Sequence, residues 1–326
     1  MSQFVDSEIS QTLEAAGAEA RYDAAARKLV AQKSILAYIL KSSMDEFADV
    51  SVKQIADELI DGSPQVSEAA VFQDVSDVLE NDNGQLNGSD RIHDMSTEDI
   101  SILEGTVRYD IRFVVKIPDV EEKVEVIVNI EIQNSDRPNY PIPKRGIYYG
   151  SRLISSQRGT IFKNQEYGKI KKVVSIWICE NTSNNRSDSI NEYLFEEKCR
   201  RGSYHEKTEN FDLIRVIVMR LGSEGVKSDD NAIRLLSNIF SSNKTADEKK
   251  KLLSEEFHIN ITELINEEVS QMCNLSAGLV KKGKEEGAME VLFKLVKKGV
   301  LSISAAAEEA GISSSIFEQK YKEFYN

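Results

Sequence analysis

Two acidic residues, Asp110 and Glu131, are the first candidates for chemistry in this sequence. Two carboxylates brought side by side repel each other, and a fold tolerates the pair if a cation lies between them or if one group keeps a proton. Oxygen ligands of this kind suit Mg²⁺ or Mn²⁺, which hold a water nucleophile and neutralise a phosphate. Gln133 lies two residues beyond Glu131, on the same face of an extended chain. The residue types therefore indicate metal-assisted phosphoryl chemistry.

The two acids meet only if the segments that carry them form a hairpin. Residues 106–117 and 124–133 each alternate apolar and polar side chains, which predicts two strands with a short connection. With Ile117 opposite Val124, the two acids face each other with Cβ atoms about 4.5–5.5 Å apart. A slip of one residue would separate them. The alternative interpretation is a solvent-facing polar stripe, with each acid paired to a nearby arginine.

A basic segment follows the hairpin. Residues 137–172 hold nine Lys and Arg residues against Glu166 alone, a net charge of +8 in a chain whose net charge is −13. A helix can begin after Pro143 and continue to about Gln157. A helix packed on the hairpin would aim one cationic face at the acids, although a solvated face balanced by acids elsewhere explains the charge equally well. The residues of this face are Arg145, Tyr149, Arg152 and Ser156.

The order of these elements resembles the PD-(D/E)XK nuclease core, and more closely its bacterial branch of recombination-promoting nucleases and transposases. The stretches that carry the resemblance are EGTVRYDIRF (104–113), VNIEIQN (128–134), YPIPKRGIYYGSRLISSQ (140–157), YGKIKKVVSIWIC (167–179) and MCNLSAG (272–278). The strand-rich middle and helical end already indicate a mixed α+β chain. The resemblance implies an α/β, restriction-endonuclease-like core, in which helices flank a central mixed sheet and a helical tail follows.

The resemblance also implies roles for individual residues. Asp110 matches the metal-binding aspartate and Glu131 the second acidic ligand, with Mg²⁺ or Mn²⁺ as cofactor. Gln133 falls where the core family has lysine, so it can hydrogen-bond a water or phosphate but carries no charge. A cation of the helix would supply the missing charge. The expected substrate-binding residues are Lys144, Arg145, Tyr149 and Arg152.

The core family uses a further acid ahead of the aspartate. Glu104 is nearest, but on a continuous strand it lies too far from Asp110 for common ligation. Its rivals are Glu58, Asp61 and Glu98, and the sequence does not choose among the four.

Composition excludes several other classes of protein. Three widely spaced cysteines exclude a disulfide scaffold and a zinc finger, and favour a cytoplasmic location. No apolar stretch approaches about 18 residues, so no membrane span is expected. The acidic N-terminus does not have the pattern of a signal peptide. The three histidines are far apart in the sequence, which argues against a His-based metal site and against a Ser-His-Asp triad.

Four regions are expected along the chain: a disordered or frayed N-terminus (1–23), a nuclease-like domain (24–225), a helical extension (226–280) and a C-terminal helical element (281–326). Residues 302–320 have the spacing of a helix-turn-helix, although few cations begin the second helix, which favours a docking element. Residues 280–287 are expected to form a charged hinge.

The leading hypothesis is a metal-dependent DNA endonuclease linked to mobile elements or recombination. Asp110 and Glu131 would bind the metal, and Glu104 would be the third acidic residue of the catalytic set. The alternative is a nucleic-acid or protein binding module on the same fold without turnover, which the glutamine at 133 would permit. Homo-oligomerisation through the helical C-terminal part is a third hypothesis.

Overall fold

The computed structural model describes residues 2–67, 98–101, 105–118, 124–183, 185–222 and 228–325. The chain divides into two compact units: Asp23–Gln271, and Met1–Tyr22 together with Met272–Asn326. The first unit thus combines the expected nuclease-like domain with most of the expected helical extension. The second unit joins the two ends of the chain, a grouping that the expected linear division did not include.

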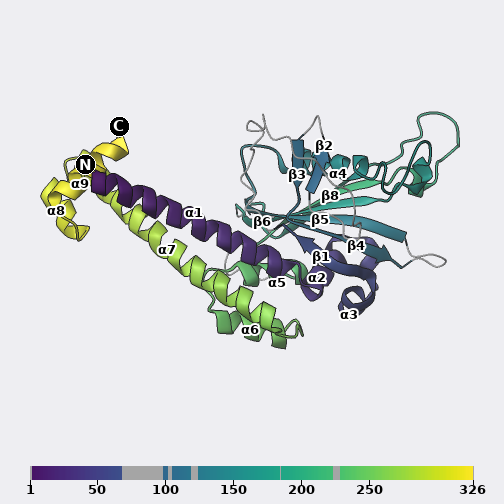
Figure 1. The fold of residues 1–326 in the computed structure, drawn as a ribbon, viewed down its shortest axis with the longest axis horizontal. Coiled ribbons are helices and arrows are strands. Elements are labelled where there is room, and N and C mark those ends of the chain that lie inside the picture. The colour runs from purple at the N-terminus through teal and green to yellow at the C-terminus, as the bar shows by residue number, and fades with distance from the viewer. Residues whose placement is uncertain are drawn as a thin grey trace, which may run out of the picture. The chain divides into compact units, whose positions relative to one another are not determined.

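A six-stranded mixed sheet forms the centre of the larger unit (Figure 1), in the order β1-β4-β5-β6-β8-β7. Its strands are β1 (Ile60–Val66), β4 (Ile111–Ile117), β5 (Val124–Ser135), β6 (Val173–Asn181), β7 (Ser189–Leu194) and β8 (Ile214–Arg220). Strands β5, β6 and β8 run parallel, and the other neighbours pair antiparallel. Helices flank this sheet, so the predicted mixed α+β, restriction-endonuclease-like fold class is confirmed.

The predicted hairpin register is confirmed. Strands β4 and β5 pair with Ile117 opposite Val124 and Ile111 opposite Ile130. Asp110 directly precedes β4, and in this register its position corresponds to that of Glu131. The alternation of apolar residues excludes a slip of one residue, which would expose the apolar face of each strand, and the symmetric pairing across the short connection selects this register.

The expected continuous strand over 106–117 is interrupted at Tyr109 and Asp110. The preceding residues form β3 (Gly105–Arg108), which pairs with β2 (Glu98–Ser101) in a separate sheet. At the break, the Asp110 carbonyl accepts a hydrogen bond from the Ser67 N–H at 3.0 Å. Its carboxylate accepts one from the Ile132 N–H at 2.9 Å. Short acidic side chains compete with the backbone for such bonds, which interrupts the ladder.

Helix α4 (Ile142–Ser155) packs closely against the sheet through two glycines. A Cβ atom on Gly146 would lie 2.9 Å from Nε1 of Trp177, and one on Gly150 would lie 2.7 Å from Cδ1 of Ile214. These glycines are four residues apart and so share a helix face. Trp177 is fully buried, as expected of a core residue. The close approach fixes the distance of α4 from β6 and β8.

The other helices differ from expectation at both ends of the chain. Helix α1 includes residues 2–23, which we expected to be frayed, and α7 runs without a break through the expected hinge at 280–287. No helix in the described ranges is long and apolar enough to cross a membrane. The helices are α1 (Ser2–Val30), α2 (Lys33–Ser43), α3 (Val52–Gln54), α5 (Asn231–Phe240), α6 (Ala246–Glu255), α7 (Glu263–Lys297), α8 (Ile303–Glu309) and α9 (Ser314–Tyr325).

The C-terminal helices pack around a small aromatic core. Helices α8 and α9 are joined through a turn at Gly311, whose φ is +68°. Phe293 of α7 contacts Phe317 of α9 edge to face, with ring centroids 5.1 Å apart. The predicted helix–turn–helix order is therefore present, and its inner face is filled by its own side chains.

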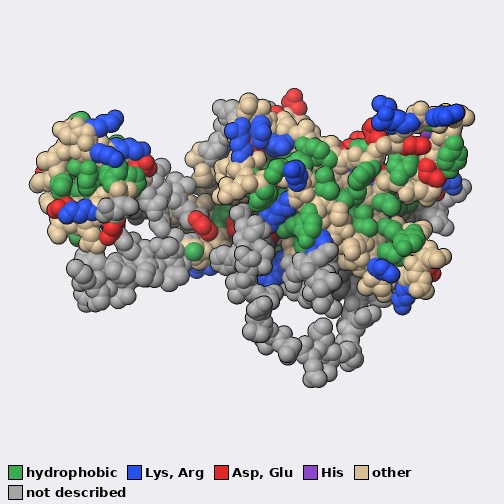
Figure 2. Space-filling model, turned by 90° about the horizontal axis from the view of Figure 1, so that it is seen from above, with side chains coloured by type: hydrophobic (Ala, Val, Ile, Leu, Met, Phe, Trp, Pro, Cys, Tyr) green, Lys and Arg blue, Asp and Glu red, His purple; other side chains and the backbone are tan. Residues whose placement is uncertain are grey.

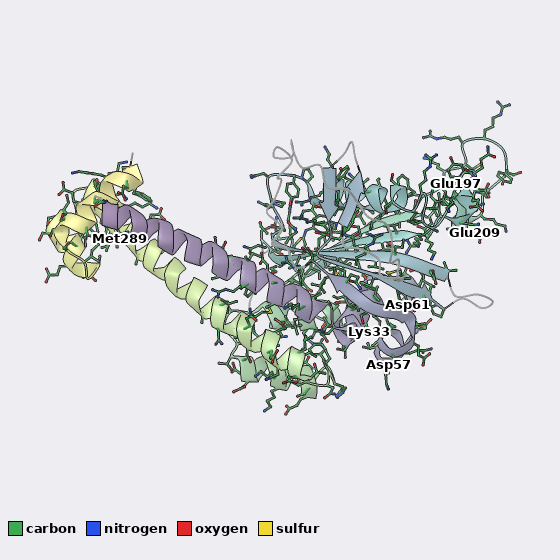
Figure 3. The ribbon with its side chains drawn as sticks, in the orientation of Figure 1. Lys33, Asp57, Asp61, Glu197, Glu209 and Met289 are labelled. Atoms are coloured by element: carbon green, nitrogen blue, oxygen red, sulfur yellow. The ribbon has the colours of Figure 1, made fainter. Side chains whose placement is uncertain are left out.

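A long segment, residues 195–213, joins β7 to β8 and projects beyond the sheet. Figure 2 shows Lys and Arg side chains along its outer rim beside hydrophobic ones. Figure 3 places Glu197 and Glu209 on this projection. Its only regular element is a short 3₁₀ turn, Thr208–Asn210.

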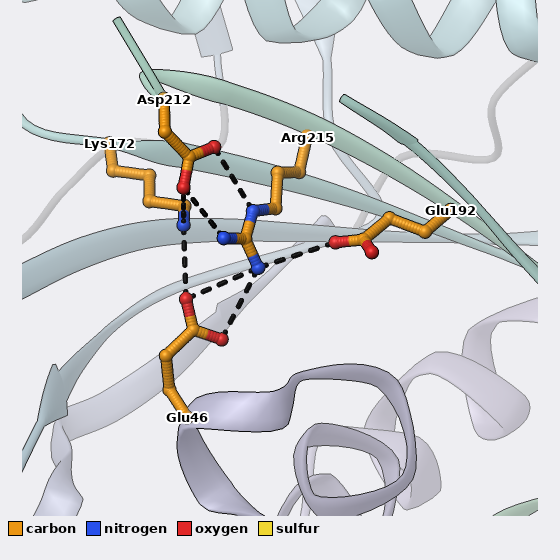
Figure 4. Close-up of polar contacts among 5 residues, drawn as sticks. All are labelled: Glu46, Lys172, Glu192, Asp212 and Arg215. Atoms are coloured by element: carbon orange, nitrogen blue, oxygen red, sulfur yellow. Dashed lines mark hydrogen bonds and ion pairs between the residues drawn. The ribbon is translucent and has the colours of Figure 1, made fainter. Parts of the chain in front are cut away.

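A half-buried charge network ties the N-terminal helices to the sheet (Figure 4). Lys172 lies 3.0 Å from Glu46 and 2.6 Å from Asp212. Arg215 of β8 contacts the same two acids, and at 3.3 Å it also contacts Glu192 of β7. The 3₁₀ turn Asp45–Phe47, which follows α2, is thereby held against the start of the parallel strands.

Candidate active site

Asp110 and Glu131 lie next to each other in the interior, with exposed fractions of 4% and 2%. The Asp110 N–H donates a hydrogen bond to Glu131 Oε1 at 3.3 Å. The Ile132 N–H donates to the other carboxylate, at Asp110 Oδ2. The hairpin register brings the two residues together, and the break before β4 turns the Asp110 side chain toward β5.

The pKa directions of the two acids follow from this burial. Loss of solvent raises the pKa of Asp110, against the opposing effect of Arg27. Burial also raises the pKa of Glu131, and the neighbouring charge of Asp110 raises it further, well above its usual range. Burial and mutual repulsion thus favour protonation of the pair, and an additional cation would oppose both effects.

Two polar neighbours of the pair were not predicted from the sequence. Arg27 of α1 is buried, and its Nη1 lies 3.4 Å from Asp110 Oδ1. Asn129 of β5 donates to Glu131 Oε1 at 3.3 Å. Its own Oδ1 is buried and has no hydrogen-bond partner among the residues that the structure covers. Asn129 shares the Glu131 face by the alternation of a strand, so that signal was present in the sequence. No local pattern indicates Arg27, which is 83 residues from Asp110.

Arg145 is the cation of α4 that reaches the site, and aromatic groups fix it in place. It donates to the hydroxyl of Tyr140, and to that of Tyr149 at 2.7 Å. Its guanidinium lies 4.8 Å and 5.1 Å from the centres of these two rings, and 5.7 Å from that of Trp177. Such stacking favours a guanidinium over an ammonium. Burial, followed by the charge of Glu131, raises the pKa of Tyr149 to about 12.

Gln133 is connected to this arginine through one hydroxyl. The Tyr140 hydroxyl donates to Gln133 Oε1 at 3.1 Å while it accepts from Arg145. The amide nitrogen of Gln133 lies 3.4 Å from the Ile132 carbonyl. Gln133 and Arg145 are thus held in one chain of hydrogen bonds beside the two acids.

These side chains line a cleft of about 110 Å³. A volume of this size holds several water molecules. The lining residues are Asp23, Arg27, Asp110, Glu131, Ile132, Gln133, Asn134, Arg145 and Glu180.

Two further acids of the cleft, Asp23 and Glu180, were not among our candidates. Burial and the charge of Asp23 raise the pKa of Glu180 to about 8. Glu180 follows Cys179, which pairs with Gln133, so the ends of two parallel strands meet here. That topology is the signal that could have indicated Glu180.

The donor set suits a hard divalent cation. Asp110 and Glu131 offer carboxylate oxygens beside a cleft with room for water, and Mg²⁺ is commonly held by one or two carboxylates with waters and phosphate oxygens. Within the described ranges no three His, Cys, Asp or Glu side chains converge as a metal-binding group. These two residues therefore fit such an ion as a pair and not as a closed cage.

Several predicted site residues do not line the cleft. Lys144 is exposed, and Arg152 is buried further along α4, where it donates to the Tyr148 hydroxyl at 3.1 Å. Among the expected upstream acids, Glu58 is exposed and Asp61 is paired with Lys116 at 2.8 Å. Glu104 and the side chain of Glu98 lie outside the part of the chain that the structure describes.

The basic segment is partly neutralised by acids. Lys169 lies 2.5 Å from Glu166, Lys171 pairs with Glu125, and Lys172 belongs to the network of Figure 4. The interpretation of balanced charge thus applies to this end of the segment, whereas Arg145 serves the cleft.

A mixed sheet whose hairpin carries two buried carboxylates beside parallel strands is consistent with a restriction-endonuclease-like fold. Residues 101–214 match the family model of the PD-(D/E)XK nuclease family transposases, so the resemblance found in the sequence is confirmed over this range. No curated protein and no solved structure matches the chain.

Proposed function

We propose that this protein is a metal-dependent endonuclease that hydrolyses phosphodiester bonds in DNA and is linked to mobile elements or recombination. The observation that carries the proposal is the buried Asp110–Glu131 pair, which shares a cleft with the fixed guanidinium of Arg145. The family match of the nuclease-like region supports the same chemistry.

Each residue of the cleft would have a separate role in this reaction. Asp110 and Glu131 would hold Mg²⁺ or Mn²⁺, and such an ion would supply Lewis-acid chemistry for the phosphate and the attacking water. Arg145 contributes a preorganised positive charge to the phosphate, because tyrosine hydroxyls and aromatic rings already hold its guanidinium. Gln133 orients a water or a phosphate oxygen through its amide group.

The second candidate is a binding module on the same fold, without turnover. It is favoured by the uncharged Gln133, whose carbonyl is occupied by Tyr140. In that case Arg145 would matter for nucleic-acid binding, and the two acids would not.

A plasmid-nicking assay with Mg²⁺ or Mn²⁺ tests the proposal, with wild type beside Glu131→Gln. The amide is close in shape to the protonated acid, so the variant keeps its fold. Metal-dependent nicking by wild type alone supports the nuclease. Binding of DNA without nicking by either protein favours the binding module, and equal nicking by both contradicts the assigned site.

A cytoplasmic location and self-association through the C-terminal helices belong to the proposal as well. The cysteines form no disulfide in the described structure, which agrees with a reducing compartment. Light scattering of the full chain at several concentrations tests the oligomeric state.

A further inference from the structure

The projecting segment between β7 and β8 ends in a compact, basic tip, residues 198–204. Glu197 closes it, because its Oε2 accepts from the Glu206 N–H at 3.2 Å and lies 3.3 Å from His205 Nδ1. Within the tip, the Cys199 thiol lies 3.4 Å from the Gly202 carbonyl, and Gly202 has a φ of +88°. The tip is thus held in a defined shape by its own contacts.

The charges of the tip are unbalanced. Its sequence, KCRRGSY, contains three cations and no acid. Lys198, Arg200 and Arg201 are all exposed, and none forms an ion pair with an acid in the described part of the chain.

Two of the acids that flank the tip are engaged in local hydrogen bonds. Glu206 accepts from Tyr204 at 3.0 Å, from the Lys207 N–H at 2.9 Å and from Asn210 at 2.8 Å. Glu197, as described above, closes the base of the tip. The three cations are therefore exposed together on residues 198–204, while the acids of the segment, exposed Glu196 among them, precede and follow the tip. This local concentration of positive charge favours an anionic partner.

Exposed aromatic rings accompany these cations. Tyr204 is 74% exposed and Phe195 is 57% exposed, although large aromatic side chains are usually buried. Aromatic rings beside Lys and Arg form the combination that binds single-stranded nucleic acid, in which bases stack on rings and cations contact phosphates. A protein partner with acidic side chains would use the cations but would not need the rings to be open.

The tip is remote from the cleft. Leu194, the last residue of β7, pairs with Arg215, whereas the cleft end of β6 pairs with Arg220. Those five residues of strand separate the two ends of the sheet by roughly 16 Å. The tip therefore contacts nothing in the catalytic arrangement, and its variants leave that arrangement intact.

We propose that the tip at residues 198–204 is a second nucleic-acid contact, at which unpaired bases stack on Tyr204 and backbone phosphates bind Arg200 and Arg201. The inference rests on the proposed function in that the bound strand belongs to the DNA substrate of the cleft. A segment of this length without regular structure is uncommon unless it has such a role.

Fluorescence anisotropy of the full chain tests the proposal, with a labelled single-stranded thymidine oligonucleotide of about 16 nucleotides. EDTA in the buffer prevents cleavage. Arg200→Ala/Arg201→Ala should weaken binding, and should reduce the slope of log K against log salt concentration by about 1.4, because two phosphate contacts are lost. Tyr204→Ala should weaken binding at least about fivefold, whereas Tyr204→Phe should bind like wild type.

The matched control is Lys53→Ala/Lys251→Ala, which removes two exposed cations that already pair with Asp57 and Glu255. Binding by the arginine variant equal to that of this control overturns the proposal. Competition by polyglutamate equal to that by DNA, with no effect of Tyr204→Ala, also overturns it and indicates an acidic protein partner.

The two proposals fail separately. If the tip variants lose binding and the wild type does not nick DNA, the proposed contact at the tip is supported and the proposed nuclease activity is rejected. If the wild type nicks DNA and the tip variants bind like wild type, the nuclease activity is supported and the contact at the tip is overturned.

Discussion

The backbone N–H of Asp110 donates to Oε1 of Glu131, so a hydrogen bond joins two buried residues whose carboxylates repel each other. The repulsion and the burial raise both pKa values, and Arg27 offsets only part of the effect at Asp110. A divalent cation would remove the conflict, and for this reason the pair is the centre of the proposed site.

Asp110→Asn should reduce DNA cleavage by at least about a hundredfold, because it removes one of two charged ligands from a preorganised site. In the metal-free variant the repulsion with Glu131 is relieved, but buried Arg27 loses its charged partner, so the melting temperature reports which of the two effects is larger. Single-turnover cleavage and calorimetry measure the two effects. The control is Asp61→Asn, an exposed acid paired with Lys116 outside the cleft, which should cleave normally. Equal activity of both variants would contradict the assignment.

Arg145→Lys should lower the cleavage rate by about 10²–10³-fold, although the charge is retained. An ammonium cannot stack on Tyr140, Tyr149 and Trp177 or donate to two hydroxyls in a planar fork. Arg158→Lys, an exposed arginine just after α4, is the control and should have little effect. A rate for Arg145→Lys equal to that of this control would mean that only the charge matters, and not its orientation.

Gly146→Ala should destabilise the larger unit by about 1–3 kcal/mol, because the added methyl group would overlap Trp177 in a filled core. Denaturant unfolding measures the loss. Cleavage should fall as well, since Arg145 is the adjacent residue and would move with α4. Gly168→Ala is the control, with no atom within 4 Å of the added Cβ and no positive φ. Equal stability of the two variants would show that α4 is free to shift.

Glu180 makes the metal-free protein less stable as the pH rises. Its pKa is raised to about 8 by burial and Asp23, so the folded state binds a proton that the unfolded state releases above its ordinary value of 4.5. The free energy of unfolding should therefore decrease between about pH 5 and pH 8. Glu180→Gln should flatten this slope, as measured by melting temperature against pH. A slope unchanged by the substitution would assign it to other groups.

The network of Figure 4 should fail at the acid end of the pH scale. Burial opposes ionisation of Glu46, but its hydrogen bonds and the charges of Lys172 and Arg215 prevail, so its pKa is lowered. Its contribution is present above the ordinary pKa of 4.5 and is lost as the pH falls below it. Glu46→Gln should lower the melting temperature at pH 7, and the difference from wild type should be smaller at a pH below 4.5. An equal difference at both pH values would mean that the charge is not responsible.

Local patterns in the sequence determined the hairpin and its acids. Alternation over 106–117 and 124–133 indicated both strands, and a symmetric pairing of Ile117 with Val124 predicted the register that the structure shows. Alternation excludes a slip of one residue, which would move the apolar side chains to the other face. A helix was predicted from after Pro143, and α4 begins slightly earlier, at Ile142; the burial of Trp177 was predictable from its apolar strand. These patterns, together with the family resemblance, led us to predict Asp110, Glu131, Gln133, Arg145 and Tyr149 as site residues. The structure places the first four of them around one cleft.

Only the tertiary structure decided which remaining groups share the cleft. Arg27, Asp23 and Glu180 arrive there from α1 and from the end of β6, and no spacing within one element relates them to Asp110. The break at Asp110 also depends on a long-range hydrogen bond, from the Ile132 N–H, which outweighs the strand pattern on either side. Short-range periodicity reports which face of an element is buried, whereas packing between distant elements determines which of the buried charges meet.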